Sequence, residues 1–251
     1  MSFPSKAETT EDALLGGRLS FLQPRRGYRV AIDPVLLAAA VAAGPSESVL
    51  DAGMGSGAAA LCLARRLPGC RVVGLERDER LLELAHANVA ANGLGERVTV
   101  LAGDLLAPPA SLRGTAFSHV MTNPPFHDAG AASPPATASG RAAHLASAEL
   151  GTWIAACLAR LRPQGRLTLV HRADKLDAIL SALIGRAGAV IVFPLWPRAG
   201  TPARRVLVRA SKGTRGPLRL AAGLALHDPS GHFTPAASAI LRDAAPLPLD
   251  P

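Results

Sequence analysis

The sequence predicts an α/β fold in which a mostly parallel sheet carries helices on both faces. Short runs rich in Val, Leu and Ile alternate with Ala- and Leu-rich stretches of helical length along most of the chain. This alternation is typical of parallel sheets that are built from strand–helix–strand units. The candidate strands are almost continuously apolar, as expected for strands that are buried on both sides. The length of 251 residues suits one large domain of this kind.

Seven strands and five helices are expected between the N-terminal segment and the last part of the chain. The strands are expected at residues 47–51, 71–75, 97–101, 117–121, 166–171, 189–193 and 205–210. The helices are expected at residues 34–43, 57–67, 79–92, 149–161 and 174–187. Asp33 and Pro34 are typical of the N-cap and first residue of the first helix. Residues 129–140 combine small residues with proline, which predicts a surface loop.

The C-terminal part departs from this alternation of strands and helices. Strand 205–210, the turn "SKGTRG" and the apolar run "LRLAAGLALHD" are expected to form antiparallel pairs at one edge of the sheet. The segment "SGHFTPAASAILR" predicts a turn and a short helix, with Thr234 as N-cap and Pro235 as first helical residue.

A glycine-rich turn follows the first long strand, in "VLDAGMGSG". Asp51 ends the strand, and three glycines follow it at alternate positions, namely Gly53, Gly55 and Gly57. Glycine permits a tight turn and lets a ligand approach the backbone closely. Such a turn alone is weak evidence of binding, so its neighbours decide its meaning.

Two further acids follow the next two strands. Glu76 ends the second strand, and Asp104 comes just after the third. The carboxyl ends of parallel strands lie at the edge of the sheet where open α/β folds bind ligands, and an acid after the second strand can accept both hydroxyls of a ribose. A carboxylate at position 104 can receive the exocyclic amine of an adenine. The three acids therefore predict a nucleoside site.

The fourth strand ends in "TNPPF", residues 122–126. Two prolines also terminate a strand, so the motif gains its meaning from its place behind the glycine turn and the acids. An amino group on an aromatic ring is a poor nucleophile, because its lone pair is delocalised into the ring. The Asn123 side-chain oxygen and the Pro124 carbonyl can accept both amino hydrogens and orient the nitrogen. Pro125 stiffens the loop, and Phe126 can stack on a base.

The succession of acid, GxGxG, two acids and Asn-Pro-Pro-Phe resembles the class I methyltransferases that depend on S-adenosyl-L-methionine and have a Rossmann-like, seven-stranded, mostly parallel sheet. The resemblance implies an enzyme that methylates an amino group beside a planar system, with S-adenosylmethionine as its cofactor. It implies the following cofactor contacts: Asp51, Gly53, Gly55 and Gly57 around the methionine part, Glu76 at the ribose, Asp104 at the adenine, and Asn123 beside cofactor and acceptor. No catalytic metal is expected.

Residues 23–41, "QPRRGYRVAIDPVLLAAAV", resemble the N-terminal signature of the bacterial tRNA N6-adenine methyltransferase group. That group includes the enzyme acting on adenine 37 of a valine tRNA. Its corresponding segment covers the cofactor pocket. The resemblance therefore implies an N-terminal extension with a covering helix over residues 1–45 and a methyltransferase domain over residues 46–251. The later segment "PARRVLVRASKG" resembles a second region of the same group.

The chain is strongly basic, with a formal net charge of +8 and an isoelectric point of about 10.6. This excess suggests a polyanionic partner, with nucleic acid first and an anionic membrane surface second. Residues 198–219 contain seven Arg or Lys residues and no acid, which favours a surface that follows phosphates. The candidate RNA contacts are Arg25, Arg26, Arg29, Arg204, Arg205, Lys212 and Arg215. We expect RNA, and tRNA in particular, as the partner.

Other substrates share the tetrapeptide. "NPPFHD", with His127, also resembles the N2-guanine methyltransferases of ribosomal RNA, but those usually carry a second, degenerate domain and this chain has one GxGxG. Protein glutamine methyltransferases remain a second alternative, although they would not need the basic stretch. A non-catalytic RNA-binding protein with a vestigial cofactor fold is disfavoured by the intact motifs.

Cysteine content and hydropathy indicate the compartment. Three cysteines without a CxxC motif indicate neither a disulfide framework nor a zinc site, which suits the cytoplasm. The N-terminus lacks the pattern of a signal peptide, and no apolar run reaches the roughly 18 residues of a membrane span, so no membrane association is expected.

Overall fold

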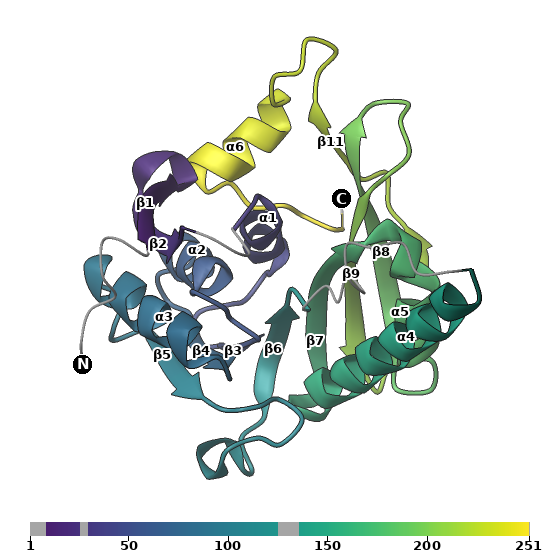
Figure 1. Ribbon diagram of the computed structural model, residues 1–251, viewed down its shortest axis with the longest axis horizontal. Coiled ribbons are helices and arrows are strands. Elements are labelled where there is room, and N and C mark those ends of the chain that lie inside the picture. Colours follow the sequence, from purple (N-terminus) through teal and green to yellow (C-terminus); the bar gives the residue numbers. More distant parts are fainter. Residues whose placement is uncertain (1–8, 26–29, 125–135, 251) are drawn as a thin grey trace.

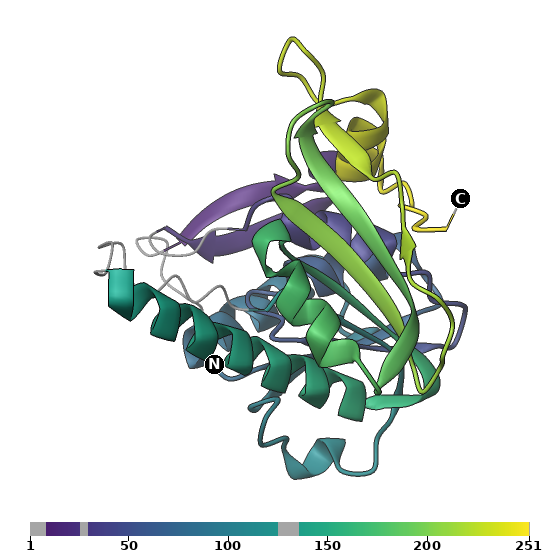
Figure 2. The same cartoon turned by 90° about the vertical axis from the view of Figure 1, so that its right-hand side faces the viewer.

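The chain forms a twisted sheet between two layers of helices (Figures 1 and 2). The computed structural model describes residues 9–25, 30–124 and 136–250, and of residues 136–147 only the helical backbone. The strands are β1 (Thr9–Leu14), β2 (Leu19–Pro24), β3 (Ser48–Ala52), β4 (Arg71–Glu76), β5 (Val98–Ala102), β6 (Phe117–Thr122), β7 (Leu161–Arg172), β8 (Ala187–Arg198), β9 (Arg205–Lys212), β10 (Arg219–Leu220) and β11 (Leu224–His227). The α-helices are α1 (Asp33–Ala40), α2 (Ala58–Arg66), α3 (Glu79–Ala91), α4 (Ala136–Ala159), α5 (Leu176–Leu183) and α6 (Pro235–Asp243), and the 3-10 turns are η1 (Leu15–Gly17), η2 (Ala110–Leu112) and η3 (Ala173–Lys175).

The central sheet confirms the predicted fold class. Its nine strands run in the order β10-β8-β9-β7-β6-β3-β4-β5, and β11 also pairs with β8. Every described pair in this sheet is parallel except those of β9, which is antiparallel to β7 and to β8. All seven expected strands are present, and β10 and β11 add short edge pieces. The strand order reverses between β3 and β6, and this switch point is where open α/β sheets bind ligands.

Two hydrophobic cores lie on the two faces of the sheet. One contains α1, α2, α6 and the inner side of α3, and the other contains α4 and α5. Val49 faces the first core and its neighbour Leu50 faces the second, and both are fully buried. Because successive side chains of a strand point to opposite faces, a strand between two helical layers must be apolar at every position. No described helix is both long and apolar enough to cross a membrane.

Two expectations about helix starts are wrong. Helix α4 begins at Ala136, so the second part of the expected loop 129–140 is helical, and residues 129–135 lie outside the described residues. The segment is rich in alanine, the strongest helix former. Asp33 is the first residue of α1 rather than its N-cap, and Ile32 in the cap position makes no side-chain bond. The Asp33 carboxylate instead pairs with Arg205 on β9, at 3.0 Å from Nε.

The C-terminal region pairs only partly as expected. β9 does pair in the antiparallel sense, but with β7 and β8 inside the sheet, and the expected antiparallel pairing of β9 with the following run is wrong, because β10 and β11 run parallel to β8. Both sides of β9 are already occupied by β7 and β8, so the next run must pair with β8 instead, and it reverses relative to β9 as β8 does. The cap of α6 is confirmed, because the Thr234 hydroxyl accepts from the Ala237 amide and Pro235 is the first helical residue.

The N-terminal hairpin β1–β2 is a feature that the sequence reading missed. It docks on α3 through two asparagines one helical turn apart. Asn88 exchanges hydrogen bonds of 2.7 and 2.8 Å with the backbone of Leu22, and Asn92 exchanges bonds of 3.1 and 2.8 Å with that of Ser20. Asn88 also donates to the carbonyl of Ser56 at 2.9 Å. The hairpin is thereby tied to the glycine turn between β3 and α2.

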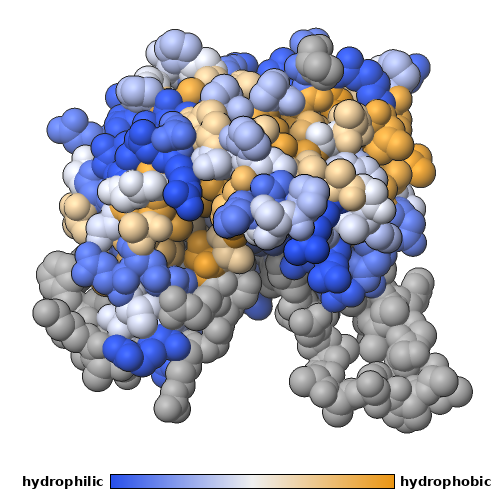
Figure 3. Space-filling view, turned by 90° about the horizontal axis from the view of Figure 1, so that it is seen from above, coloured by the Kyte–Doolittle hydropathy of each residue, from blue (hydrophilic) through white to orange (hydrophobic). Residues whose placement is uncertain are grey.

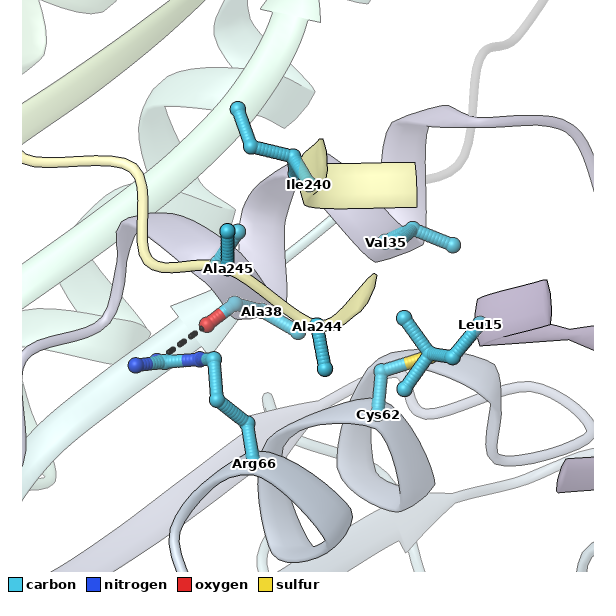
Figure 4. A pocket seen from close by; sticks show the side chains of 9 residues that line it. Leu15, Val35, Ala38, Cys62, Arg66, Ile240, Ala244 and Ala245 are labelled. Atoms are coloured by element: carbon cyan, nitrogen blue, oxygen red, sulfur yellow. Dashed lines mark hydrogen bonds between the residues drawn. The ribbon is translucent and has the colours of Figure 1, made fainter. Parts of the chain in front are cut away.

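A small cavity of about 10 Å³ lies where α1, α2 and α6 meet (Figure 4). Arg66 of α2 lies beside it and donates to the Ala38 carbonyl at 2.7 Å and to the Val41 carbonyl. The Ala38 carbonyl also accepts from the Val41 amide at 3.3 Å, so the guanidinium adds a second bond to this carbonyl and one to the carbonyl of Val41, the C-cap residue. From the C-terminal tail, the Leu247 amide donates to the Ala39 carbonyl at 2.9 Å. These contacts fix the end of α1 and define a structural joint.

Candidate active site

The glycine turn adopts a backbone that other residues rarely take. Gly53, Gly55 and Gly57 have φ angles of +72°, +57° and +96°. These values lie in the left-handed region, where a side chain costs roughly 1–2 kcal/mol per residue. The Gly53 amide donates to the Leu75 carbonyl at 2.9 Å, which joins the end of β3 to the end of β4. The alternate glycines are therefore required by the conformation of the turn.

Asp51 is a buried carboxylate just before this turn. Its residue is 2% exposed. Burial raises the pKa of Asp51 to about 7, the Ala60 amide opposes this rise, and the negative charge of Glu76 adds to it. Within the described structure, Oδ2 has no hydrogen-bond partner. A buried carboxylate oxygen with unused acceptor capacity suits a cationic ligand group such as an ammonium.

The Glu76 carboxylate ties the end of β4 to the glycine turn that follows β3. Its Oε2 accepts from the Gly55 amide at 2.9 Å, and its Oε1 accepts from the amides of Arg77 and Asp78 at 2.8 and 3.0 Å. A carboxylate has about four acceptor positions, so Oε2 retains capacity for a ligand hydroxyl. Glu76 therefore shapes the turn and can also bind a ligand.

Asp104 follows β5 at the same edge of the sheet. Its Oδ1 accepts from the Leu106 amide at 2.9 Å, and its Oδ2 lies 3.5 Å from Nη1 of Arg77. The side chain is 35% exposed, in contrast to that of Asp51. The three acids thus stand at the carboxyl ends of three adjacent strands, where Asp51 is buried and Glu76 and Asp104 are half-buried.

Asn123 and Pro124 follow β6, the neighbour of β3 on the other side. Asp51 is paired in register with Met121, so Asn123 and Gly53 each lie two residues beyond this level on adjacent strands. Neighbouring strands are about 4.8 Å apart, so the backbone of the predicted acceptor motif lies next to the glycine turn. Asn123 is half-buried and Pro124 is buried. Pro125 and Phe126 of the motif lie outside the described residues.

Trp153 of α4 contacts both of these segments. Its Nε1 donates to the Thr122 hydroxyl at 3.0 Å, and that hydroxyl donates to the Ala52 carbonyl at 2.8 Å. A methyl group built on Gly53 would come within 3.0 Å of Trp153 Cζ2, so the indole packs directly against the turn. No local sequence pattern indicates this bridge, because Trp153 is 31 residues from Thr122. Trp153 therefore couples the glycine turn to the end of β6, which Asn123 directly follows.

Substitution of Trp153 by phenylalanine is expected to lower kcat about fivefold. The ring remains, but one buried hydrogen bond worth about 1 kcal/mol is lost and the end of β6 is held less firmly. Steady-state kinetics at saturating substrates measure the effect. Trp196→Phe is the matched control, because Trp196 also donates from Nε1 to a carbonyl, that of Ala222 at 3.0 Å, but on β8. Equal kcat values for the two variants would contradict the positioning role.

The predicted RNA contacts are separated by the fold. Arg204 and Arg205 lie at the start of β9, on the same sheet edge as Asn123, and Arg205 pairs with Asp33. Lys212 lies at the other end of the antiparallel β9, where its ammonium donates to the Leu161 carbonyl at 2.7 Å, and Arg215 follows it. The seven cations of residues 198–219 therefore do not form one continuous surface beside the acceptor motif.

Two more arginines of that stretch are engaged by the C-terminal tail. Arg209 and Arg219 both form ion pairs with Asp250. Arg25, at the end of β2, donates to the Thr9 carbonyl at 3.4 Å. Arg26 and Arg29 lie outside the described residues, and RNA binding by all these residues stays a prediction.

Comparison with known families places the chain. The model of the methyltransferase small domain matches residues 32–190, a span that contains the glycine turn, the three acids, Asn123 and Trp153. The chain belongs to the methyltransferase small domain family. The motifs predicted an S-adenosylmethionine-dependent methyltransferase, and this prediction is confirmed.

Relatives of this methyltransferase act on different substrates. The tRNA1(Val) (adenine(37)-N6)-methyltransferase of Aeromonas hydrophila is 34% identical over 192 residues, which are 75% of this chain and 79% of that protein. The release factor glutamine methyltransferase of Moorella thermoacetica is 35% identical over 169 residues, which are 66% of this chain and 50% of that protein. A solved structure from Agrobacterium tumefaciens, described as a predicted O-methyltransferase, superposes with a TM-score of 0.72 at 28% identity and covers 86% of this chain and 98% of its own.

The residues of the site fit S-adenosylmethionine. The unused Oδ2 of Asp51 suits an ammonium, and the side-chain-free turn at Gly53 and Gly55 lets a ligand approach the backbone. Glu76 keeps acceptor capacity at the end of β4 for a ribose. The chemistry of this donor set agrees with an amino acid joined to a nucleoside.

Proposed function

We propose that this methyltransferase methylates an exocyclic amino group of RNA, with adenine N6 of tRNA as its target. The observation that carries the proposal is the placement of Asn123 and Pro124 one strand away from the glycine turn, at the same level and edge of the sheet. In this proposal Asp51 and the glycines hold the methionine part, Glu76 holds the ribose and Asp104 receives the adenine amine.

The acceptor residues orient the amino nitrogen rather than deprotonate it. Asn123 Oδ1 and the Pro124 carbonyl accept one amino hydrogen each, which directs the nitrogen lone pair out of conjugation with the ring. When bound, S-adenosylmethionine supplies an electrophilic methyl group on a sulfonium. With that methyl group in place, the nitrogen–carbon bond would form as the carbon–sulfur bond breaks, and Asn123 and Pro124 would hold the nitrogen in position. The surplus proton then leaves the nitrogen for water, so no basic side chain is required.

Two observations favour tRNA over a protein glutamine. The alignment with the tRNA enzyme of A. hydrophila spans 79% of that protein, whereas the alignment with the glutamine enzyme spans half of its relative. The net charge of +8 also suits a polyanionic substrate. We place this enzyme in the cytoplasm, because its three free cysteines, all buried, would stay reduced there.

Methylation of defined tRNA transcripts tests this proposal. A valine tRNA transcript is incubated with enzyme and S-adenosylmethionine, digested, and analysed for nucleosides by mass spectrometry. N6-methyladenosine is expected, and a transcript with guanine in place of adenine 37 should yield none. A release factor is assayed in parallel, and methylglutamine in that protein without any methylated RNA nucleoside would overturn the RNA assignment.

A further inference from the structure

A groove lined by both polar and apolar residues opens at the tip of the β8–β9 hairpin. Figures 1 and 2 show this hairpin and β11 rising beyond the rest of the sheet. The groove has a volume of about 730 Å³, and its lining includes Arg198, Thr201, Arg204, His227 and Gly231. The face on which it lies is seen directly in Figure 3, where strongly hydrophilic clusters alternate with hydrophobic ones.

The register of the sheet places the groove relative to the acceptor motif. Thr122, at the end of β6, is level with Leu169, Val208 and Val192 on the next three strands. Arg204 is four residues beyond Val208 and Arg198 is six residues beyond Val192. At about 3.3 Å per residue, their backbones project about 13 and 20 Å past the end of β6, on the side of Asn123.

The side chains of Arg198 and Arg204 are available to bind a ligand. Both residues are exposed, and neither forms an ion pair within the described part of the chain, whereas Arg205 is paired with Asp33. Asp228, the residue after His227 of the lining, is the acid next to the groove in sequence. Its Oδ1 accepts from the Ser230 hydroxyl at 2.6 Å and the His232 amide at 3.0 Å, and it forms no ion pair with Arg198 or Arg204 in the described structure.

The backbone of the groove is held rigidly. The Thr201 hydroxyl accepts from the Arg198 amide at 3.2 Å and donates to its carbonyl at 2.7 Å, which closes the hairpin turn. Nδ1 of His227 donates to the Pro197 carbonyl at 3.1 Å, and its ring stacks on Phe233 at 4.8 Å. A fixed backbone lowers the ordering cost when the two arginines bind a ligand.

We propose that this groove binds the phosphodiester backbone of the tRNA that carries the target base. This inference rests on the proposed function. The arginine guanidinium matches a phosphate bidentately and is well suited to nucleic-acid backbones. Protein partners usually bury apolar or aromatic anchors, and the described lining holds two prolines and the already stacked His227 but no large aliphatic side chain.

The test compares two double variants that remove the same charge. Arg198→Gln/Arg204→Gln acts on the groove, and Arg71→Gln/Arg113→Gln is the control. Arg71 begins β4 and Arg113 precedes β6, so both control positions lie at the opposite edge of the sheet, and both are exposed. Binding of an unmodified tRNA transcript is measured by fluorescence anisotropy at several salt concentrations, together with the Kd for S-adenosylmethionine.

The groove variant is expected to bind the transcript about 10- to 100-fold more weakly, with the salt slope reduced by about 1.5, the value for two lost phosphate contacts. Its Kd for S-adenosylmethionine and the tRNA affinity of the control variant should stay near the wild-type values. Wild-type affinity and slope in the groove variant, equal weakening in both variants, or absence of tRNA binding by the wild type would each overturn the inference. Failure of the proposed function is a separate result, in which the wild type binds the transcript but methylates no nucleoside of it.

Discussion

Replacement of Asn123 by alanine is expected to lower kcat by about 100- to 1,000-fold, the usual loss when one preorganised hydrogen-bonding group at a reacting centre is removed. The alanine variant loses the acceptor that holds an amino hydrogen, so the nitrogen keeps its lone pair in the ring. The Kd for S-adenosylmethionine should change little, because the contacts assigned to the cofactor lie mainly on β3, β4 and β5. Single-turnover methylation and calorimetry measure these two quantities separately.

Asn123→Asp is the matched control for this substitution. Aspartate has the same shape and keeps an acceptor oxygen, so its activity should lie well above that of the alanine variant. An unchanged kcat in Asn123→Ala would remove the residue from the acceptor site. A parallel loss of cofactor affinity would instead move its role to cofactor binding.

The parts of the fold that the sequence predicted are those that local patterns determine. The strands of the central sheet are apolar at almost every position, because both faces are covered, and glycines mark the turn at 53–57 where positive φ angles demand them. The hairpin β1–β2 was not predicted, because its partners lie about seventy residues away, Asn88 in α3 and Asn92 at the C-cap of that helix. The signals available in the sequence were the alternation of apolar Leu19 and Phe21 with Ser20 at the start of "LSFLQP", and the pair Gly16–Gly17.

The basic stretch shows the limit of reading charge from sequence. Residues 198–219 contain no acid, yet acids that are distant in sequence neutralise part of the stretch, namely Asp33 at Arg205 and Asp250 at Arg209 and Arg219. The antiparallel course of β9 also carries its two ends to opposite edges of the sheet. Only tertiary structure shows that Arg198 and Arg204 form no ion pair with any acid of the described residues, on the side of the sheet where Asn123 lies.

Substitution of Asp51 by asparagine is expected to weaken S-adenosylmethionine binding about 100-fold while stabilising the protein without cofactor. Removal of one partner of a buried charge pair costs about 3 kcal/mol or more, which accounts for the lost affinity. The folded-state pKa of Asp51 is about 7, against an ordinary value of 3.8. The folded state therefore binds this proton more tightly than the unfolded state. Its contribution to stability is fully present below pH 3.8 and is lost as the pH rises towards 7.

Asparagine does not ionise, so its advantage over wild type should grow between pH 4 and 7 and then level off. After the cost of one unpaired buried amide, we expect a gain of about 1–3 kcal/mol in the free energy of unfolding at pH 8, and little or no gain at pH 4. Urea denaturation at both pH values and calorimetric titration measure the two effects. Asp104→Asn makes the same chemical change on a carboxylate that is 35% exposed, and it should not stabilise the protein. A stability difference for Asp51→Asn that is equal at pH 4 and pH 8 would show that burial of its charge is not what the cofactor relieves.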